Sequence, residues 1–332
     1  MTKLFTIDEV KKLVTLDEVL HSVEKTFAGL ADGTVVNPAK VTLDLGETAS
    51  YPPYEGFFNA MPAYIGTQDI AGIKWVGGIA GERKKAGLPF LCGIIVLADP
   101  KLGKFLAVMD GAYITELRTG AQTAIALKYI LPDKKQIKVG LYGTDNSAKI
   151  QIQAVAKCFE IQELRVYDDD PALSPKFQKT MQDIVKCPII LCEHPKQVCC
   201  GDTVIASKPW KGGLIRAEWI EPGTVVFPLG ATAKMEKEAI IQSDYIIVDH
   251  IQQALHRGAL KELYNQGKIH QEHITTTIGE LVNGTAALDD IKNKRILCVP
   301  IGTGAMDIAI ADDFYHKALR NGMGTEFDIT GE

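Results

Sequence analysis

The residues best placed to do chemistry lie between Lys138 and Asp170, in the stretch KVGLYGTDNSAKIQIQAVAKCFEIQELRVYDDD. Gly143 follows a short apolar run, apolar residues at helical spacing come next, and Asp168 stands 25 positions after Gly143. This layout suits a dinucleotide, because the N–H groups and dipole at a helix start favour a pyrophosphate and a carboxylate accepts hydrogen bonds from ribose hydroxyls. The alternative is an ordinary strand–helix–strand crossover that binds no nucleotide.

The glycine motif departs from the expected Gly-x-Gly-x-x-Gly/Ala at its second glycine. Gly143 and Ala148 take the first and third roles, but Asp145 stands in the second. A glycine there lets the backbone approach the pyrophosphate closely, whereas Asp adds a side chain and a negative charge near an anion. If Asp145 points at the pyrophosphate, cofactor affinity falls. If it turns away and caps the helix beside Asn146, binding survives.

Three consecutive carboxylates, Asp168 to Asp170, bear on which cofactor the chain prefers. A carboxylate at the end of the second strand accepts hydrogen bonds from ribose hydroxyls and repels a 2′-phosphate. The run therefore favours NAD over NADP. The alternative interpretation is a solvated acidic turn before Pro171.

The elements that must position this segment are predicted as alternating strands and helices. Strands are expected at 139–142, 164–167, 189–192, 202–207, 224–229 and 245–248, and helices near 148–156, at 175–185, from Lys234 and at 305–321. The alternation continues through 274–283 and 295–304. Such alternation is typical of an α/β domain with a parallel sheet.

The residues before this segment show a different pattern. Two helices are predicted within 6–33, the first capped by Thr6 with Glu9 and the second starting at Asp17 and ending at Gly33. Strands are expected at 35–45, 57–63, 71–77, 93–98 and 105–109, followed by a long helix over 114–131. A run of strands after two helices indicates an α+β domain. The final helix is expected to return and pack on it.

Composition excludes several classes of protein. The chain has 332 residues, 46% of them hydrophobic, and a net charge of −5. Without a long basic run, neither nucleic acid nor an anionic membrane is an expected partner. No stretch approaches the ~20 apolar residues that span a bilayer, and the charged N-terminus does not resemble a signal peptide, so the expected location is the cytoplasm. Seven cysteines without CxxC spacing argue against a disulfide framework or a zinc site, and no metal is expected.

Several stretches together make the chain resemble the ornithine cyclodeaminase/mu-crystallin family. They run through nearly the whole length in the family's order: NAMPAYIG (59–66), AGIKWVGG (71–78), GLP (87–89), LAVMDGAYITELRTGA (106–121), the VGLYG…YDDD unit, AEWIEPGTVVFPLGA (217–231), IGEL (278–281) and IGTGAMDIAIA (301–311). The LRTGA segment after an LAVMDG strand is the most specific of these.

The resemblance implies an α/β fold with two domains and a homodimer. A substrate-binding and dimerisation domain of α+β type would span 1–118, completed by a C-terminal helix within 306–332, and a Rossmann-type NAD(P)-binding domain would span 119–305. It also implies hydride transfer at the α-carbon of a small amino or imino acid. The residues expected to bind the cofactor are Thr119, Gly143, Thr144, Asp145, Asn146, Ser147, Ala148, Asp168 and Gly230.

In the family, three basic groups usually hold the substrate carboxylate, and by motif they fall on Lys40, Lys74 and Arg118. The chemistry suits the role: Arg offers a bidentate fork, while Lys provides a point charge or, with a lowered pKa, an acid or base. Each has the alternative of being a surface cation. That alternative fits Lys40 well. It fits Lys74, in an apolar strand, and Arg118, just inside a helix, less well.

Two departures from the family pattern bear on the reaction. Members that cyclise ornithine carry an acidic residue where this chain has Asn59, and a catalytic Asp where it has Thr232. Thr does not take up a proton near neutral pH, and mu-crystallin-like members, which resemble ketimine reductases, also carry a hydroxyl residue there. The first hypothesis is therefore an NAD(P)-dependent oxidoreductase of an amino or cyclic imino acid, with Lys74 and Thr232 as the catalytic candidates and Lys40, Asn59 and Arg118 holding substrate. The alternatives are a cyclodeaminase that uses NAD catalytically and a ligand-binding protein without turnover.

Overall fold

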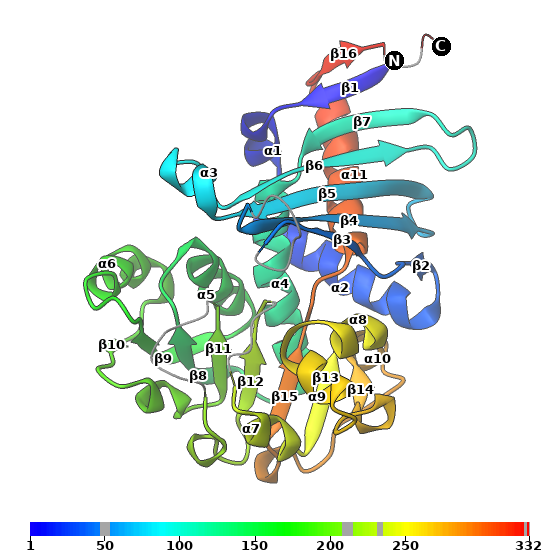
Figure 1. Cartoon of the computed structure of the whole chain (residues 1–332). Helices are drawn as coiled ribbons and strands as arrows, with labels where there is room; N and C mark the ends of the chain where they lie inside the picture. The colour runs from blue at the N-terminus through cyan, green and yellow to red at the C-terminus, as the bar shows by residue number, and fades with distance from the viewer. Residues whose placement is uncertain (47–53, 208–214, 231–234, 329–330, 332) are drawn as a thin grey trace. The chain divides into compact units, whose positions relative to one another are not determined.

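The computed structural model describes residues 1–46, 54–207, 215–230, 235–328 and 331 (Figure 1). The chain divides into two compact units. One consists of Met1–Arg118 together with Thr303–Glu332, and the other of Thr119–Gly302. Across the described residues, no helix combines the length and apolar character needed to cross a membrane.

The first unit is built on one mixed sheet. Its strands are β1 (Thr2–Phe5), β2 (Val35–Val36), β3 (Val41–Asp44), β4 (Gly56–Ile65), β5 (Ile70–Ile79), β6 (Leu91–Ala98), β7 (Phe105–Asp110) and β16 (Thr325–Phe327). Its helices are α1 (Ile7–Leu13), α2 (Leu16–Asp32), α3 (Gly81–Lys85), the first part of α4 (Ala112–Ile130) and α11 (Gly304–Arg320). The strand order is β16-β1-β7-β6-β5-β4-β2, with β3 also paired to β4, and β1 lies parallel to β7.

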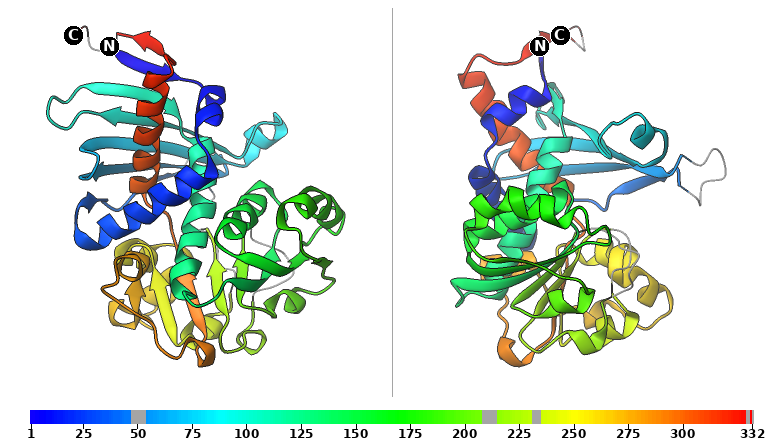
Figure 2. Two further views of the ribbon diagram at one scale, coloured as in Figure 1. Left: turned by 180° about the vertical axis from the view of Figure 1, so that it is seen from behind. Right: turned by 90° about the vertical axis from the view of Figure 1, so that its left-hand side faces the viewer.

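One face of this sheet is covered by α11, which crosses β4, β5 and β6 and packs beside α2 (Figure 2, left). The covered face buries Met61, Ile95 and Leu97, and burial of apolar surface of this kind is the main stabilising term of a core. The helix starts close to the sheet: a Cβ on Gly304 would lie 2.6 Å from the Met61 carbonyl oxygen. Glycine at this position therefore lets the first turn of α11 approach β4.

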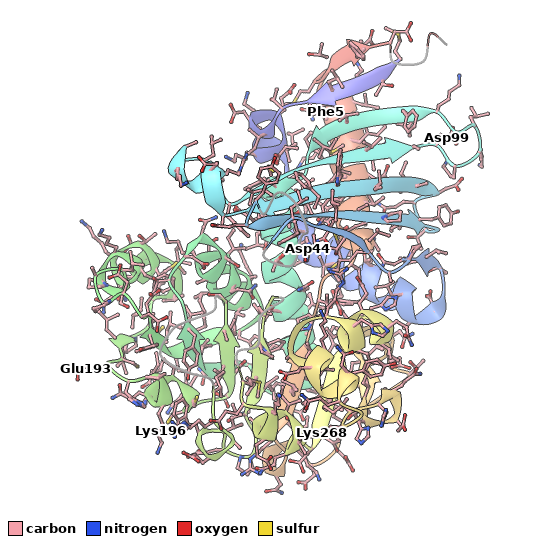
Figure 3. The ribbon with its side chains drawn as sticks, in the orientation of Figure 1. Phe5, Asp44, Asp99, Glu193, Lys196 and Lys268 are labelled. Atoms are coloured by element: carbon pink, nitrogen blue, oxygen red, sulfur yellow. The ribbon has the colours of Figure 1, made fainter. Side chains whose placement is uncertain are left out.

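The two ends of the chain meet at the edge of this sheet, which the sequence did not predict. β1 pairs antiparallel with β16, with Lys3 opposite Glu326. Phe5, labelled in Figure 3, lies edge-on to Phe314 of α11 with ring centroids 5.0 Å apart. The final helix, expected at 305–321, is confirmed as α11 (Gly304–Arg320), and the strand β16 that follows it was not predicted.

Most other expectations for the first unit are confirmed, with shifted boundaries. Thr6 and Glu9 form the predicted capping box. The second helix begins at Leu16 instead of Asp17, because Thr15 is its N-cap and forms a capping box with Glu18. The predicted strand over 35–45 is two strands, β2 and β3, and a proline without an N–H donor stands between them at position 38. Lys40 consequently precedes β3 and does not lie within a strand.

The second unit contains a parallel sheet. Its strands are β8 (Gln136–Tyr142), β9 (Glu160–Tyr167), β10 (Ile189–Leu191), β11 (Thr203–Ala206), β12 (Val225–Pro228), β13 (Tyr245–Val248), β14 (Thr276–Thr277) and β15 (Ile296–Val299). Its helices are the rest of α4, α5 (Asn146–Cys158), α6 (Ser174–Val185), α7 (Lys237–Ile241), α8 (Ile251–His256), α9 (Lys261–Asn265) and α10 (Ile278–Asn283). The predicted helix start at Lys234 lies outside the described residues.

The strand order in this unit is β10-β9-β8-β11-β12-β15-β13-β14, and every pair is parallel. Its first five strands repeat the 3-2-1-4-5 order of Rossmann-type domains. In such sheets the order reverses beside the first strand, here between β8 and β11, and ligands bind outside the carboxyl ends of the strands at that point. The residues after β8 and β9 are therefore the ones positioned to meet a cofactor.

Candidate active site

The first candidate site is the environment of Lys74 on β5. Lys74 is completely buried, and its neighbours across the sheet, Met61 on β4 and Ile95 on β6, are apolar. Its Nζ lies 2.5 Å from Oδ2 of Asp307, in the first turn of α11, and Asp307 is equally buried. A buried lysine held by one buried carboxylate is not a surface cation, so the structure rules out that alternative for Lys74.

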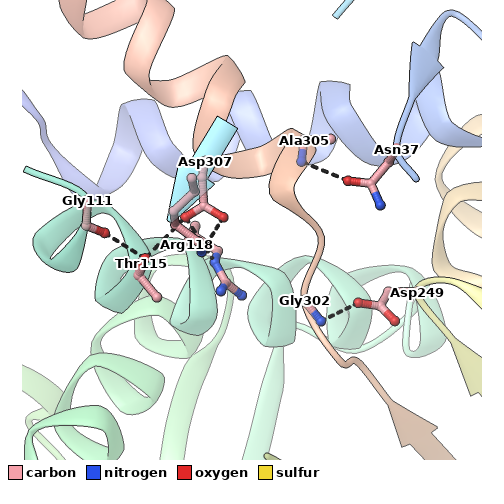
Figure 4. Close-up of polar contacts among 9 residues, drawn as sticks. Asn37, Gly111, Thr115, Arg118, Asp249, Gly302, Ala305 and Asp307 are labelled. Atoms are coloured by element: carbon pink, nitrogen blue, oxygen red, sulfur yellow. Dashed lines mark hydrogen bonds and ion pairs between the residues drawn. The ribbon is translucent and has the colours of Figure 1, made fainter. Parts of the chain in front are cut away.

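Arg118 reaches the same carboxylate from α4. Its Nε lies 3.4 Å from Oδ1 of Asp307, and the Thr115 hydroxyl lies 3.3 Å from that oxygen while donating to the Gly111 carbonyl at 2.6 Å (Figure 4). Arg118 retains 7% of its exposure. The structure thus brings Lys74 and Arg118 together, as expected, and adds Asp307 between them.

The electrostatic balance at Lys74 lowers its pKa from 10.5 to about 7. The largest cause is burial, which disfavours the charged amine, and Arg118 acts in the same direction. Asp307 opposes both by Coulomb attraction and by hydrogen bonding. A lysine with a pKa near neutrality suits general acid–base chemistry, since it can both give and take a proton at working pH.

Asp307 was missed at the sequence level. The only signal was a carboxylate within the apolar run GAMDIAIA, where a charged side chain needs a partner if it is buried. Its partners, Lys74 and Arg118, are more than 180 positions away in sequence, so no local pattern pairs them.

The two other substrate candidates also lie in the first unit. Asn59 lies on β4 two residues before Met61, so both side chains belong to the sheet face that carries Lys74. Its Oδ1 accepts a hydrogen bond from the Thr42 hydroxyl at 2.5 Å. Lys40, partly buried, precedes β3, whose Val41 pairs with Ala60.

The second candidate site is the glycine turn after β8 in the other unit. Gly143 has φ 97°, a left-handed conformation that favours glycine, and its N–H donates to the Tyr167 carbonyl at 2.9 Å. The Thr144 hydroxyl donates to Oδ2 of Asp168 at 2.6 Å, and the Asp170 N–H donates to Oδ1 at 3.0 Å. Asp168 is only 6% exposed, so its carboxylate is held in one orientation at the carboxyl end of β9.

Of the two orientations considered for Asp145, the structure shows the capping one. Asp145 is the N-cap of α5, with extended backbone, and its Oδ1 accepts the Ala148 N–H at 2.9 Å. Asn146 and Ser147 form the first turn of that helix, and Ala148 is buried. A carboxylate occupied in capping keeps the helix start intact, although its charge remains at the end where an anion would bind.

The remaining cofactor candidates lie in the same unit. The Thr119 carbonyl accepts the Gln151 side-chain amide at 3.0 Å, which ties α4 to α5. Gly230 follows β12 with φ 88°. Thr232 lies outside the described residues.

A third polar group, also missed at the sequence level, lies at the carboxyl ends of β13 and β15. Asp249 follows β13 directly, is buried, and its Oδ2 accepts the Gly302 N–H at 2.5 Å (Figure 4). Its other carboxylate oxygen and both amide atoms of buried Gln253 have no hydrogen-bond partner within the described part of the chain. Such atoms are costly unless a bound molecule satisfies them, so this edge of the sheet can receive a polar ligand.

Comparison with known proteins finds one family that matches nearly the whole chain. A model of the ornithine cyclodeaminase/mu-crystallin family matches residues 1–322. Alanine dehydrogenase of Archaeoglobus fulgidus is 31% identical over 328 residues, which cover 98% of each chain.

Two solved structures match almost the whole chain. An archaeal alanine dehydrogenase dimer with bound NAD has a TM-score of 0.88 and 30% identity, covering 99% of both chains. The Δ1-pyrroline-2-carboxylate reductase of Thermococcus litoralis, in complex with NADH and L-proline, has a TM-score of 0.87 and 27% identity, covering 98% of this chain and all of the other. These matches confirm the predicted α/β fold with its Rossmann-type domain.

Proposed function

The chain belongs to the ornithine cyclodeaminase/mu-crystallin family, and from that premise we propose that it is an NAD(H)-dependent oxidoreductase that interconverts an amino acid and the corresponding imino acid. The observation that carries this proposal is the buried cluster of Lys74, Arg118 and Asp307. With all three groups ionised, its net charge is +1, which matches one substrate carboxylate. Dehydrogenases and reductases of this chemistry are among the relatives that match over most of their length.

The residues of the second unit fit NAD. The glycine turn at Gly143, the capped start of α5 and the oriented Asp168 carboxylate correspond to the pyrophosphate and ribose sites of Rossmann-type domains. The unpartnered atoms of Asp249 and Gln253 offer donors and acceptors at the carboxyl edge of the same sheet. When bound, NAD(H) would accept or supply the hydride. Asp168 favours NAD over NADP, because its carboxylate repels a 2′-phosphate.

The residues of the first unit supply the rest of the chemistry. Arg118 would hold the substrate carboxylate with its guanidinium fork. Lys74 would hold or release a proton at the substrate nitrogen, since its pKa of about 7 lies near working pH. Lys40 and Asn59 are proposed as further substrate contacts, and Thr232 as a second catalytic candidate. On this proposal Met1–Arg118 with Thr303–Glu332 binds substrate, and Thr119–Gly302 binds the cofactor.

We also propose a homodimer formed through the first unit. The sheet face opposite α11 exposes large apolar side chains, among them Trp75, Ile94, Val41 and Leu43. A patch of this kind on a sheet marks an interaction surface, and the matching archaeal alanine dehydrogenase is described as a dimer. Sedimentation should give the mass of two chains, and Trp75→Glu should shift it toward one. A cytoplasmic location stays a prediction, as does the lack of a nucleic-acid partner.

Turnover on a defined panel tests the proposed reaction. NADH consumption is followed with Δ1-pyrroline-2-carboxylate and with pyruvate plus ammonia, and NAD⁺ reduction with L-proline and L-alanine. At least one pair should turn over, and Lys74→Met and Arg118→Met should abolish it. Lys85→Met is the control, because Lys85 also forms an ion pair, with Glu82, but on an exposed helix. Ammonia release from ornithine without net NADH would instead identify a cyclodeaminase, and tight NADH binding without any turnover would identify a binding protein.

A further inference from the structure

The carboxylate of Asp307 is the least expected feature of the first unit. It is completely buried in the first turn of α11, with Lys74 Nζ 2.5 Å from Oδ2. Arg118 Nε lies 3.4 Å from Oδ1 (Figure 4). Two cations from β5 and α4 thus converge on one anion from the far end of the chain. An arrangement of this kind costs desolvation energy, and a helix start needs no such pair to pack on a sheet.

The surroundings of Lys74 show what this anion does. The strands on either side present Met61 and Ile95, which are apolar. The charged groups that act on Lys74 are Arg118 of α4 and Asp307 of α11. Burial and Arg118 both favour the neutral amine, whereas Asp307 favours the ammonium. The charged state of Lys74 near neutral pH therefore depends on Asp307.

We propose that Asp307 is a positioning residue that keeps the proton on Lys74 and fixes the direction of its Nζ, an inference that rests on the proposed oxidoreductase function. In imine reduction the α-carbon gains a hydride from the dihydronicotinamide. The electron pair of the C=N bond moves to nitrogen, and that nitrogen takes the proton of Lys74, which becomes neutral. Solvent then restores the proton. Asp307 touches neither substrate nor cofactor in this scheme and acts only through Lys74 and Arg118.

The pH profile of imine reduction distinguishes this role from a structural one. Wild-type kcat/KM should fall as pH rises through a midpoint near 7, where Lys74 loses its proton. Asp307→Asn should move that midpoint about 1–3 pH units toward acid, the usual effect of one close opposite charge. At pH values above the wild-type midpoint, kcat/KM of Asp307→Asn should then be about tenfold to a thousandfold below that of the wild type. The affinity for NADH should be unchanged.

The control is Asp312→Asn on the same helix. Asp312 is also a buried carboxylate, but its partner is His316, 3.4 Å away. Asp312→Asn should leave the pH midpoint in place. If Asp307→Asn also leaves it in place, or if both variants move it equally, the proposed role of Asp307 is wrong.

A second measurement does not depend on turnover. The urea midpoints of Lys74→Met, Asp307→Asn and the double variant form a cycle. Because Asp307→Asn leaves Lys74 buried without its anion, removing both partners should cost less than the sum of the single changes. Additive losses would overturn the pairing. A wild-type protein that turns over no imine would refute the proposed function, and the cycle would still decide whether Asp307 holds Lys74.

Discussion

Thr144→Val removes one hydrogen bond from the carboxylate proposed to select the cofactor. The Thr144 hydroxyl donates to Oδ2 of Asp168 at 2.6 Å, and both side chains are buried at the end of β8 and β9. Valine keeps the shape of threonine but offers no donor. The carboxylate would then lose a donor to its Oδ2, while the Asp170 N–H still donates to Oδ1.

The size of the effect follows from the charge of the acceptor. A hydrogen bond to a charged group contributes about 1.5–3 kcal/mol, against about 0.5–1.5 kcal/mol for a neutral one. Thr203→Val is the matched control, because buried Thr203 on β11 of the same sheet donates to the neutral Val225 carbonyl at 3.0 Å. Thr144→Val should therefore lower the free energy of unfolding about twice as much as Thr203→Val. If the free energy of NADH binding at the ribose site is also weakened by about 1.4 kcal/mol, the affinity for NADH drops about tenfold.

Two assays check this expectation. Urea unfolding gives the two stability losses, and titration of nicotinamide fluorescence gives the affinities for NADH and NADPH. Thr144→Val should reduce the preference for NADH over NADPH, whereas Thr203→Val should leave it unchanged. Equal stability losses together with an unchanged cofactor preference would refute the assignment of Thr144 as the group that orients Asp168.

Three further predictions concern single contacts. Asp145→Gly should tighten NADH binding about two- to fivefold in the same titration. It removes a negative charge from the helix N-terminus, where a charge changes the interaction free energy by about 0.3–1 kcal/mol, and glycine still serves as an N-cap. Weaker binding would show that the capping hydrogen bond of Asp145 contributes more than the loss of its charge. The pKa of Lys74 is about 7 in the folded chain, against an ordinary value of 10.5 for lysine, so the unfolded chain binds more protons between these two values. This group therefore makes the free energy of unfolding rise with pH in that window by about 1.4 kcal/mol per pH unit. Lys74→Met should flatten the slope measured by urea unfolding from about pH 7 to 10, and an unchanged slope would contradict the lowered pKa. Asn37→Ala should cost about 1–3 kcal/mol in urea unfolding, because Asn37 Oδ1 accepts the buried Ala305 N–H at the start of α11 (3.0 Å); no loss would show that another acceptor replaces it.

Local patterns predicted much of this molecule. Three features depend only on residues a few positions apart, so they are visible in the sequence. They are helix caps such as Thr6 with Glu9, the alternation of strands and helices after position 138, and the turn at Gly143. The error at the start of α2 was of the same local kind, since Thr15 and Asp17 both stand where a cap is expected and only the capping box with Glu18 decides between them.

Contacts between distant segments could not be predicted in this way. The pairing of β1 with β16 joins strands of four and three residues from opposite ends of the chain, and strands that short leave no periodic signal. No local pattern connects the Asp307 carboxylate with its partners on β5 and α4, which are far away in sequence. In the same way, the sequence left two orientations open for Asp145, and only the position of the Ala148 N–H shows which one the helix start uses.

Transfer of a deuterium label tests the central claim most directly. The protein is supplied with NADH in which deuterium replaces both hydrogens at C4 of the nicotinamide, together with an α-imino acid that it reduces. The product amino acid is analysed by mass spectrometry. We expect one deuterium on the α-carbon of the product of the wild-type protein, and no labelled product when Arg118→Met is used in its place. NADH binding with an unlabelled product, or ammonia release without label, would contradict an oxidoreductase that acts at the α-carbon.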